Sequence, residues 1–280
     1  MLAVLATMVS VVSGTASHAQ AAKSAAIARP PIRCTAPGQR PITVVLVHGA
    51  WADNESWSGE LSELQRDGCA VRAADNPVRN LKTDAAAVAN FVRAIPGPVL
   101  LVGHSYGGSV ITNAAAEVHN VVGLVYVDAF APAVGESASE LGGETSAVAA
   151  HPASQLFDEI PGAPKDAGNI ILKKNAFLRY FASDVPRPQA LSLWASQTVA
   201  SSQALGAPSQ YATWKTLPSW YFISSADQII TPQSMLAMAH RAHSQITLFH
   251  GGSHLTLISH PAAVTAVIAE ALSSLLAVGK

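Results

Sequence analysis

Ser105 is the side chain of this sequence that is best suited to covalent chemistry. It lies in residues 103–108, GHSYGG, between the apolar run 98–102 and a predicted helix. A G-x-S-x-G segment between a strand and a helix is typical of a nucleophile elbow, a tight turn that projects the serine hydroxyl from the sheet. Gly103 and Gly107 supply the side-chain-free positions that this turn needs. Ser105 is therefore the candidate nucleophile, and the alternative is an ordinary turn with an incidental serine.

A candidate acid and a candidate base follow further along the chain. Serine is a weak nucleophile that needs a base, and behind such an elbow the order along the chain is serine, carboxylate, histidine. Asp227 comes just after the apolar run 220–223, and His254 follows the run 245–249 in a loop that contains glycine. We predict a triad in which Asp227 orients His254 and neutral His254 takes the serine proton. Activity should then fall in acid near the unperturbed histidine pKa of about 6.5.

Two alternatives compete with parts of this assignment. Asp128 also follows an apolar run, 121–127, and is a second candidate for the acid. We favour Asp227 because its loop should be nearer to the loop of His254 in the strand order. A metal site is the other alternative, but no cysteine or carboxylate completes a ligand pattern around the remaining downstream histidines, so we expect no metal and no cofactor. Those histidines are His240, His243, His250 and His260.

Acyl transfer also needs two hydrogen-bond donors for the oxygen that becomes negative. One candidate is the backbone N–H of Tyr106, directly after the nucleophile, and the other lies in the loop HGAW at 48–51. In that loop Gly49 lets the backbone turn, so Ala50 can present its N–H. We place His48 in this loop and His104 in the buried part of the elbow, and neither is the predicted base.

The elements that carry these residues alternate between apolar strands and amphipathic helices. Continuous apolar strands separated by helices indicate a mostly parallel sheet buried on both faces, which is an α/β fold. Together with the nucleophile elbow they predict the α/β-hydrolase type. Strands are predicted at 42–47, 70–74, 98–102, 121–127, 220–223 and 245–249. One of the helices should begin at Thr83 as its N-cap, and the last should cover 261–276. The stretch 132–217 shows helical pieces without a strand of similar strength, and we predict a helical cap insertion there, within a single domain over 42–277.

Composition limits the partners and the compartment. Only 12% of the 280 residues are charged, the net charge is −1, and no run of like charge attracts nucleic acid or an anionic membrane. Residues 1–21 are apolar and then rich in small residues, which predicts a signal peptide cut after Ala19 or Ala21, although no Lys or Arg precedes the apolar run. The run is too short to form a transmembrane anchor. We expect export to the periplasm or the medium, and the alternative is a cytoplasmic leader.

Two cysteines fit that compartment. Cys34 lies in the predicted tail 22–41 and Cys69 opens the strand 70–74. Neighbouring parallel strands begin at the same edge of a sheet, so an exported chain should join the two cysteines in a disulfide. In the cytosol they would be two unrelated thiols.

The motifs together resemble a known family. Residues 45–53 (VLVHGAWAD), 103–108, 219–221 (SWY) and 253–261 (SHLTLISHP) are similar to those of bacterial α/β-fold hydrolases, which in turn resemble plant methyl salicylate esterases and hydroxynitrile lyases. The resemblance covers about residues 40–277. It implies carboxylesterase activity without a cofactor, the triad and oxyanion donors named above, and a helical cap.

Departures from the pattern favour the esterase branch of this family. The hydroxynitrile lyases have a lysine after the catalytic histidine and a threonine in the oxyanion loop, where this chain has Leu255 and Gly49. A serine nucleophile also argues against the dehalogenases and epoxide hydrolases of this fold.

The leading hypothesis is hydrolysis of a small to medium, mostly uncharged carboxylic ester through an acyl-enzyme. A cofactor-free perhydrolase that uses peroxide in place of water, similar to haloperoxidases, is the second hypothesis. The third is a ligand-binding protein that keeps the fold without catalysis.

Overall fold

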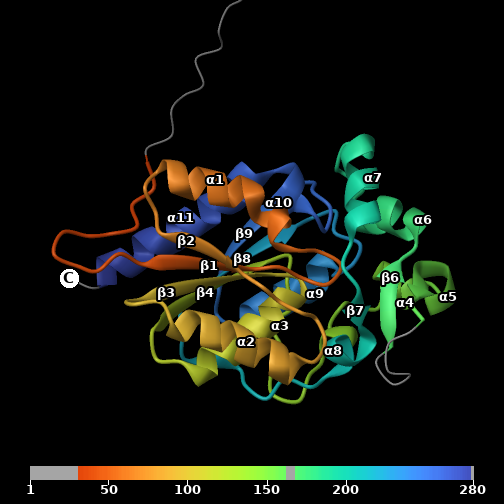
Figure 1. Ribbon diagram of the computed structural model, residues 1–280, viewed down its shortest axis with the longest axis horizontal. Coiled ribbons are helices and arrows are strands. Elements are labelled where there is room, and N and C mark those ends of the chain that lie inside the picture. Colours follow the sequence, from red (N-terminus) through yellow and green to blue (C-terminus); the bar gives the residue numbers. More distant parts are fainter. Residues whose placement is uncertain (1–30, 162–167, 279–280) are drawn as a thin grey trace, which may run out of the picture. The chain divides into compact units, whose positions relative to one another are not determined.

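Six parallel strands form the main sheet of the computed structural model, which describes residues 31–161 and 168–278 (Figure 1). Their order is β2-β1-β3-β4-β8-β9, and every neighbouring pair runs parallel. The strands are β1 (Thr43–Val47), β2 (Val71–Ala74), β3 (Val99–His104), β4 (Val121–Val127), β8 (Ser219–Ser224) and β9 (Gln245–Phe249). The predicted α/β-hydrolase fold with a mostly parallel sheet is confirmed.

Helices cover both faces of this sheet. In Figure 1, α1 (Ser58–Arg66) and α11 (Pro261–Val278) lie on one face, and α2 (Leu81–Arg93) and α3 (Tyr106–Ala114) lie on the other. Every residue of β1, β3 and β8 is buried, as expected for strands enclosed between two helical layers. The strand β9 at the sheet edge is only partly buried. The other elements outside the cap are η1 (Asn54–Trp57), η2 (Ala115–Glu117), α9 (Pro232–Arg241) and α10 (Thr256–Ser259).

The start of α2 differs from the prediction. Its N-cap is Asn80, whose side chain accepts the N–H of Lys82 at 3.0 Å, so the helix begins two residues before Thr83. Thr83 lies inside the first turn and donates its hydroxyl to the carbonyl oxygen of Asn80. Both residue types are good N-caps, and local sequence does not decide between them.

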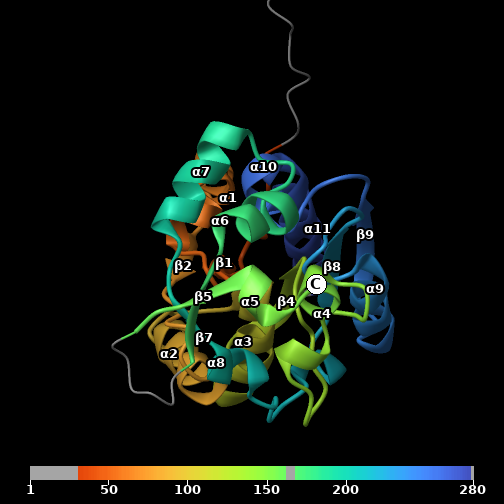
Figure 2. The ribbon, with the colours of Figure 1, turned by 90° about the vertical axis from the view of Figure 1, so that its right-hand side faces the viewer.

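The insertion between β4 and β8 contains a small sheet as well as helices. Three short antiparallel strands in the order β5-β6-β7 were not predicted, because strands of two to four residues show no usable periodicity. Figures 1 and 2 show this cap, coloured green to teal, at one end of the main sheet. Its elements are η3 (Ala138–Glu140), α4 (Ala147–Ala150), α5 (Ala153–Leu156), β5 (Phe157–Glu159), β6 (Asn169–Leu172), α6 (Lys174–Ala176), the π-helical η4 (Phe177–Phe181), α7 (Arg187–Ser196), β7 (Ala200–Ser201), α8 (Ser202–Gly206) and η5 (Thr213–Lys215).

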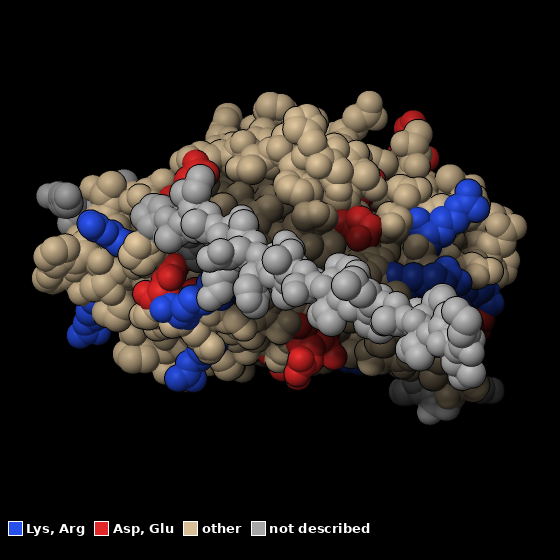
Figure 3. Space-filling view, turned by 90° about the horizontal axis from the view of Figure 1, so that it is seen from above, with Lys and Arg blue, Asp and Glu red and all other residues tan. Residues whose placement is uncertain are grey.

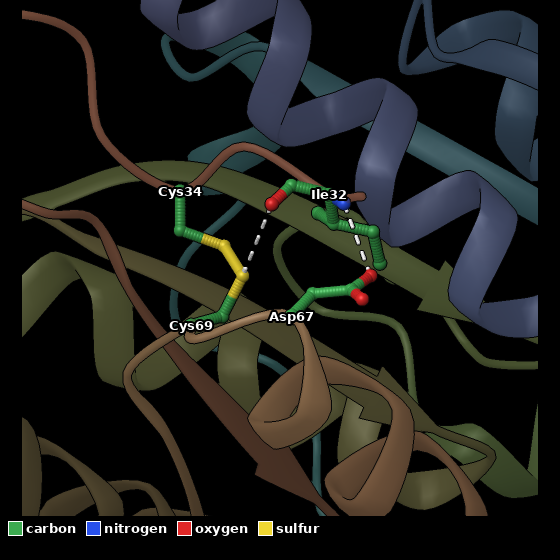
Figure 4. The surroundings of a disulfide bond; sticks show 4 residues. All are labelled: Ile32, Cys34, Asp67 and Cys69. Carbon is green, nitrogen blue, oxygen red and sulfur yellow. Dashed lines mark hydrogen bonds between the residues drawn. A yellow bond between two sulfur atoms is a disulfide. The ribbon is translucent and has the colours of Figure 1, made fainter. Parts of the chain in front are cut away.

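The segment before β1 is packed from Ile32 onward. Ile32 and Cys34 are buried, the N–H of Ile32 donates to Asp67 Oδ2 at 3.0 Å, and Cys34 forms a disulfide with Cys69 across a Cα–Cα distance of 5.4 Å (Figure 4). This part of the predicted tail therefore belongs to the same compact unit as the sheet. The predicted signal peptide, 1–21, lies outside the described residues.

The helices and one face of the described structure can be compared with the expectations from composition. No helix in the described part of the chain is long and apolar enough to cross a membrane. On the face seen in Figure 3, lysine, arginine, aspartate and glutamate side chains are scattered among uncharged ones. This distribution agrees with the net charge of −1.

Removing the disulfide should lower the free energy of unfolding. The bridge closes a loop with a sequence separation of 35, and constraining the unfolded chain to such a loop is worth roughly 2–4 kcal/mol. Urea unfolding of the double variant Cys34→Ala/Cys69→Ala, compared with the parent recovered from a bacterial periplasm, measures the difference. Equal stability, or two free thiols titrated in the unfolded and unreduced parent, would contradict this expectation.

Candidate active site

Ser105 stands at a sharp turn between β3 and α3. Its backbone has a φ of +52°, in the left-handed region that costs a residue with a side chain about 1–3 kcal/mol and is common at functional sites. A Cβ on Gly107 would lie 2.3 Å from the carbonyl oxygen of Val47, and one on Gly103 would lie 2.6 Å from the carbonyl of Gly107. Only glycine fits these two positions, as the elbow pattern requires.

The three residues predicted as a triad lie in one hydrogen-bonded row. Ser105 Oγ is 2.8 Å from His254 Nε2, and His254 Nδ1 is 2.7 Å from Asp227 Oδ2. All three side chains are buried. Since the carboxylate accepts the Nδ1 proton, Nε2 carries the lone pair that can receive the serine proton. Asp227 comes from the loop after β8 and His254 from the loop after β9, so three strand ends meet here.

The second oxygen of Asp227 is also held. Asp227 Oδ1 accepts the N–H of Ile229 at 2.7 Å and that of Ile230 at 3.1 Å. Burial raises the pKa of Asp227, and these two N–H groups oppose that effect. The carboxylate is thus fixed in position with both of its oxygens hydrogen-bonded.

Burial keeps the imidazole of His254 uncharged. Enclosed on all sides, the ring cannot hydrate a positive charge, which lowers the pKa of His254 from 6.5 to about 3. An unperturbed histidine titrates at about 6.5, the value expected from the sequence. Burial shifts the expected acid limit below that value, and the Asp227 carboxylate at 2.7 Å opposes the shift.

Asp128, the second candidate for the acid, bonds to a different partner. Its Oδ1 accepts the N–H of Ser224 at 2.7 Å, and its Oδ2 lies 2.7 Å from the Ser224 hydroxyl. The carboxyl group is fully buried, which raises its pKa, and the neighbouring charge of Asp227 raises it further. Asp128 therefore holds the end of β8, just before the loop of Asp227.

The candidate oxyanion donors flank Ser105. The loop after β1 approaches so closely that a Cβ on Gly49 would lie 2.6 Å from Ser105 Cβ. The next residue, Ala50, is buried and lines the same cavity as Ser105. Tyr106 is the first residue of α3, so its N–H has no acceptor within the helix. Both N–H groups are therefore candidates to bind a developing oxyanion beside Ser105.

A largely apolar cavity of about 470 Å³ opens beside Ser105. Most of its walls are supplied by aromatic and aliphatic side chains, among them Trp51, Phe130, Phe157, Ile170, Leu205 and Ile229. Among the described residues, the charged side chains that line it are two carboxylates, Glu140 and Glu144. The lining residues that the structure describes suit an uncharged organic ligand and include no cation that could bind an anionic one.

His48 and His104 hold backbone around the site. His104 Nε2 donates to the carbonyl oxygen of His254 at 2.8 Å, and His48 Nδ1 donates to that of Gly49 at 2.9 Å. Burial lowers the pKa of both imidazoles. The downstream His240, His243, His250 and His260 are exposed, and the described part of the chain contains no group of three potential metal ligands.

Asp184, in the cap, also contacts the site, and no sequence motif marks it. Its carboxylate accepts the hydroxyl of Ser253 and, at 2.6 Å, the hydroxyl of Ser259. These serines stand on either side of His254, so the cap helps to hold the loop that carries the candidate base. Asp184 lies 69 residues before Ser253 and 75 residues before Ser259 in the chain, and no local sequence pattern predicts such contacts.

Comparison with known proteins agrees with this architecture. A family described as "Alpha/beta hydrolase family" matches residues 44–267. A carbendazim-hydrolyzing esterase from Nocardioides sp. (strain SG-4G) is 33% identical over 106 residues, which cover 33% of this chain and 44% of that protein. The chain thus matches less than half the length of this relative.

Solved structures share the fold. An extracellular alpha/beta-hydrolase from a Paenibacillus species, described as sharing structural and functional homology with tobacco salicylic acid binding protein 2, has a TM-score of 0.68 at 22% identity. It covers 82% of this chain and 99% of its own. The Arabidopsis methylesterase MES16 has a TM-score of 0.68 at 18% identity, with 83% and 99% covered. The predicted resemblance to this group of hydrolases is confirmed.

Asp227→Asn should reduce turnover by roughly ten-thousandfold with little change in melting temperature. Asparagine keeps the shape but removes the charge that selects the His254 tautomer and stabilises the imidazolium. Asp128→Asn is the matched control, because it removes an equally buried carboxyl and should be much milder. If Asp128→Asn is the crippling change and Asp227→Asn stays within about tenfold of the parent, the acid is Asp128.

The acid limb of the pH–rate profile should lie well below pH 6.5. Only neutral His254 accepts the serine proton, and a lowered pKa keeps the ring neutral as the pH falls. Measurement of kcat/KM from pH 4 to 9, with enzyme stability checked at each pH, locates the midpoint. A midpoint at or above 6.5 would mean that burial does not control this histidine.

Proposed function

The chain belongs to the alpha/beta hydrolase family, and we propose that it is a serine hydrolase which cleaves small to medium, mostly uncharged carboxylic esters through an acyl-enzyme. One observation carries the proposal. Beside an apolar cavity, His254 hydrogen-bonds to Ser105 at 2.8 Å through Nε2 and to Asp227 at 2.7 Å through Nδ1. No metal or cofactor enters the proposed reaction.

The proposed reaction begins when Ser105 Oγ attacks the ester carbonyl carbon and its proton moves to His254 Nε2. Asp227 stabilises the imidazolium, and the negative oxygen of the tetrahedral intermediate receives hydrogen bonds from the N–H groups of Ala50 and Tyr106. His254 then gives the proton to the leaving alcohol, and the acyl group stays on Ser105. A water molecule, deprotonated by His254, attacks the acyl-enzyme and releases the acid.

Ester hydrolysis is the branch of the family that the site and the relatives support. Esterase activity is in keeping with the alpha/beta hydrolase family of the chain and with relatives such as the Nocardioides esterase. The position after His254 is occupied by buried Leu255, so no cation stands there to stabilise a cyanide leaving group. The apolar cavity, with Glu140 and Glu144 as its charged lining residues among those described, favours uncharged esters over carboxylate-bearing ones.

We also propose that the enzyme is exported. The apolar, small-residue pattern of 1–21 supports this, and so does the Cys34–Cys69 disulfide, because such bonds persist in oxidising compartments. Full-length chain that stays uncleaved in the cytoplasm of a bacterial host would contradict export.

Ser105→Ala should abolish ester hydrolysis while the protein keeps its fold. Loss of the serine from such a triad typically costs on the order of a millionfold in turnover. Ser109→Ala is a matched control, because Ser109 is a buried serine on α3, the helix that follows Ser105, and takes no part in the proposed reaction. Activity of Ser105→Ala above a tenth of the parent would refute the assignment.

A panel of p-nitrophenyl esters with rising acyl length, together with methyl, aryl and carboxylate-bearing esters, should show faster cleavage of the uncharged ones.

A further inference from the structure

The loop between β2 and α2, residues 76–80, has no part in the proposed reaction, yet it contacts the oxyanion loop. The side-chain amide of Asn76 donates to the carbonyl oxygen of His48 at 2.8 Å, and its backbone N–H donates to His48 Nε2 at 3.3 Å. Asn76 is buried. These bonds fix the position of the chain two residues before Ala50, which carries one proposed oxyanion donor.

The same loop is also connected, through Asp84 of α2, to the residue that carries the other donor. The phenolic hydroxyl of Tyr106 donates to Asp84 Oδ2 at 2.9 Å. That carboxylate oxygen also accepts the backbone N–H of Arg79 at 3.0 Å and that of Asn80 at 3.2 Å. Asp84 and Tyr106 are both buried, so this junction is shielded from water. The side chain of Tyr106 is thereby tied to the loop 76–80.

Arg79 connects this junction to the cap. Its Nη1 donates to Asn169 Oδ1 at 2.6 Å at the start of β6, and its Nη2 donates to the carbonyl oxygen of Val199 just before β7. The N–H of Ser201 in β7 donates to the carbonyl oxygen of Val78 at 2.9 Å. In Figures 1 and 2, β7 lies beside α2 in both views. The guanidinium group places a separate nitrogen donor on each of the two acceptors in a fixed planar geometry, whereas a lysine ammonium offers a single nitrogen on a flexible chain.

The oxyanion loop reaches the same cap strand directly. The indole N–H of Trp51, the residue after Ala50, donates to the carbonyl oxygen of Ile170 in β6 at 3.2 Å, and its ring stacks on Phe157 in β5 at 5.5 Å. Trp51 and Val78 both have positive φ, at +59° and +53°. Non-glycine residues persist in this region only where their surroundings hold them. The cap sheet supplies contacts of that kind to both residues.

We propose that Arg79 is a positioning residue that couples the cap sheet to the oxyanion hole. By fastening β6 and Val199 to the loop 76–80, it keeps the backbone at Ala50 and Tyr106 in the arrangement that binds the tetrahedral intermediate. The inference rests on the proposed function. Phe157 and Ile170 of the cap sheet also line the cavity, so the strands that Arg79 and Trp51 hold are strands that a bound ester touches. Because oxyanion donors act mainly on the transition state, loss of Arg79 should reduce kcat much more than it raises KM.

The decisive experiment compares Arg79→Ala with the parent in steady-state kinetics on an uncharged p-nitrophenyl ester. It adds inhibition by a trifluoromethyl ketone, whose tetrahedral adduct with Ser105 places an oxyanion in the hole. Displacement of a single oxyanion donor typically costs roughly a hundredfold or more, so we expect kcat to fall by about tenfold to a hundredfold with KM within about threefold. The inhibition constant of the ketone should rise by the factor that kcat/KM loses. Arg187→Ala, which removes an exposed arginine from α7 of the same cap, should change neither quantity.

Two further variants separate positioning from general damage. Tyr106→Phe removes only the hydroxyl that bonds to Asp84, and its effect should be less than additive with that of Arg79→Ala, because both act through the same connection. If Arg79→Ala does not fold, Arg79→Lys keeps a cation at this site but loses the fixed planar pair of donors, and it should also lower kcat with little change in KM.

Failure of the inference about Arg79 and failure of the proposed function would give different results. A folded Arg79→Ala variant with kcat within about twofold of an active parent would overturn the inference and leave the proposed function intact, as would a rise in KM alone. A parent that hydrolyses no ester in a Ser105-dependent way would refute the proposed function itself.

Discussion

The row of hydrogen bonds from Asp227 through His254 to Ser105 is the interaction on which the rest of the site depends. All three groups are buried, and buried polar groups are costly unless they are paired. Each side chain pairs with the next, and the outer oxygen of Asp227 is satisfied by the N–H groups of Ile229 and Ile230. Removal of any one member would leave another buried without its partner. The hydrogen bonds that satisfy these buried groups are therefore the same bonds along which the serine proton can move to His254.

The strand order of the sheet brings the three residues of this row together. Ser105 follows β3, Asp227 follows β8 and His254 follows β9, and parallel strands bring these three ends to one edge. The candidate oxyanion loop follows β1, the neighbour of β3 on the other side, where Gly49 allows close approach to Ser105. The left-handed backbone of Ser105 persists because the packed strand and helix on either side hold it. The cap contributes through Asp184, which bonds to both serines that flank the His254 segment.

The parts that sequence could predict are those with a local pattern. Glycines around Ser105 mark the elbow, and the apolar runs before Asp227 and His254 mark the strand ends. The choice of Asp227 over Asp128 followed from strand order, and the structure places the two carboxyls on different partners. The strands β5, β6 and β7 are too short to show periodicity. Arg79 reaches its cap acceptors across 90 and 120 residues, and such contacts leave no local pattern.

The central claim, that this buried row turns Ser105 into a nucleophile, is tested most directly by covalent labelling. A fluorophosphonate reacts with an activated serine, and intact-mass and peptide-mass spectrometry give the number of adducts and their position. The account predicts one adduct per chain, located on Ser105, that forms far more slowly when His254 is replaced by alanine. An adduct on another residue, or no adduct on folded protein, would contradict it.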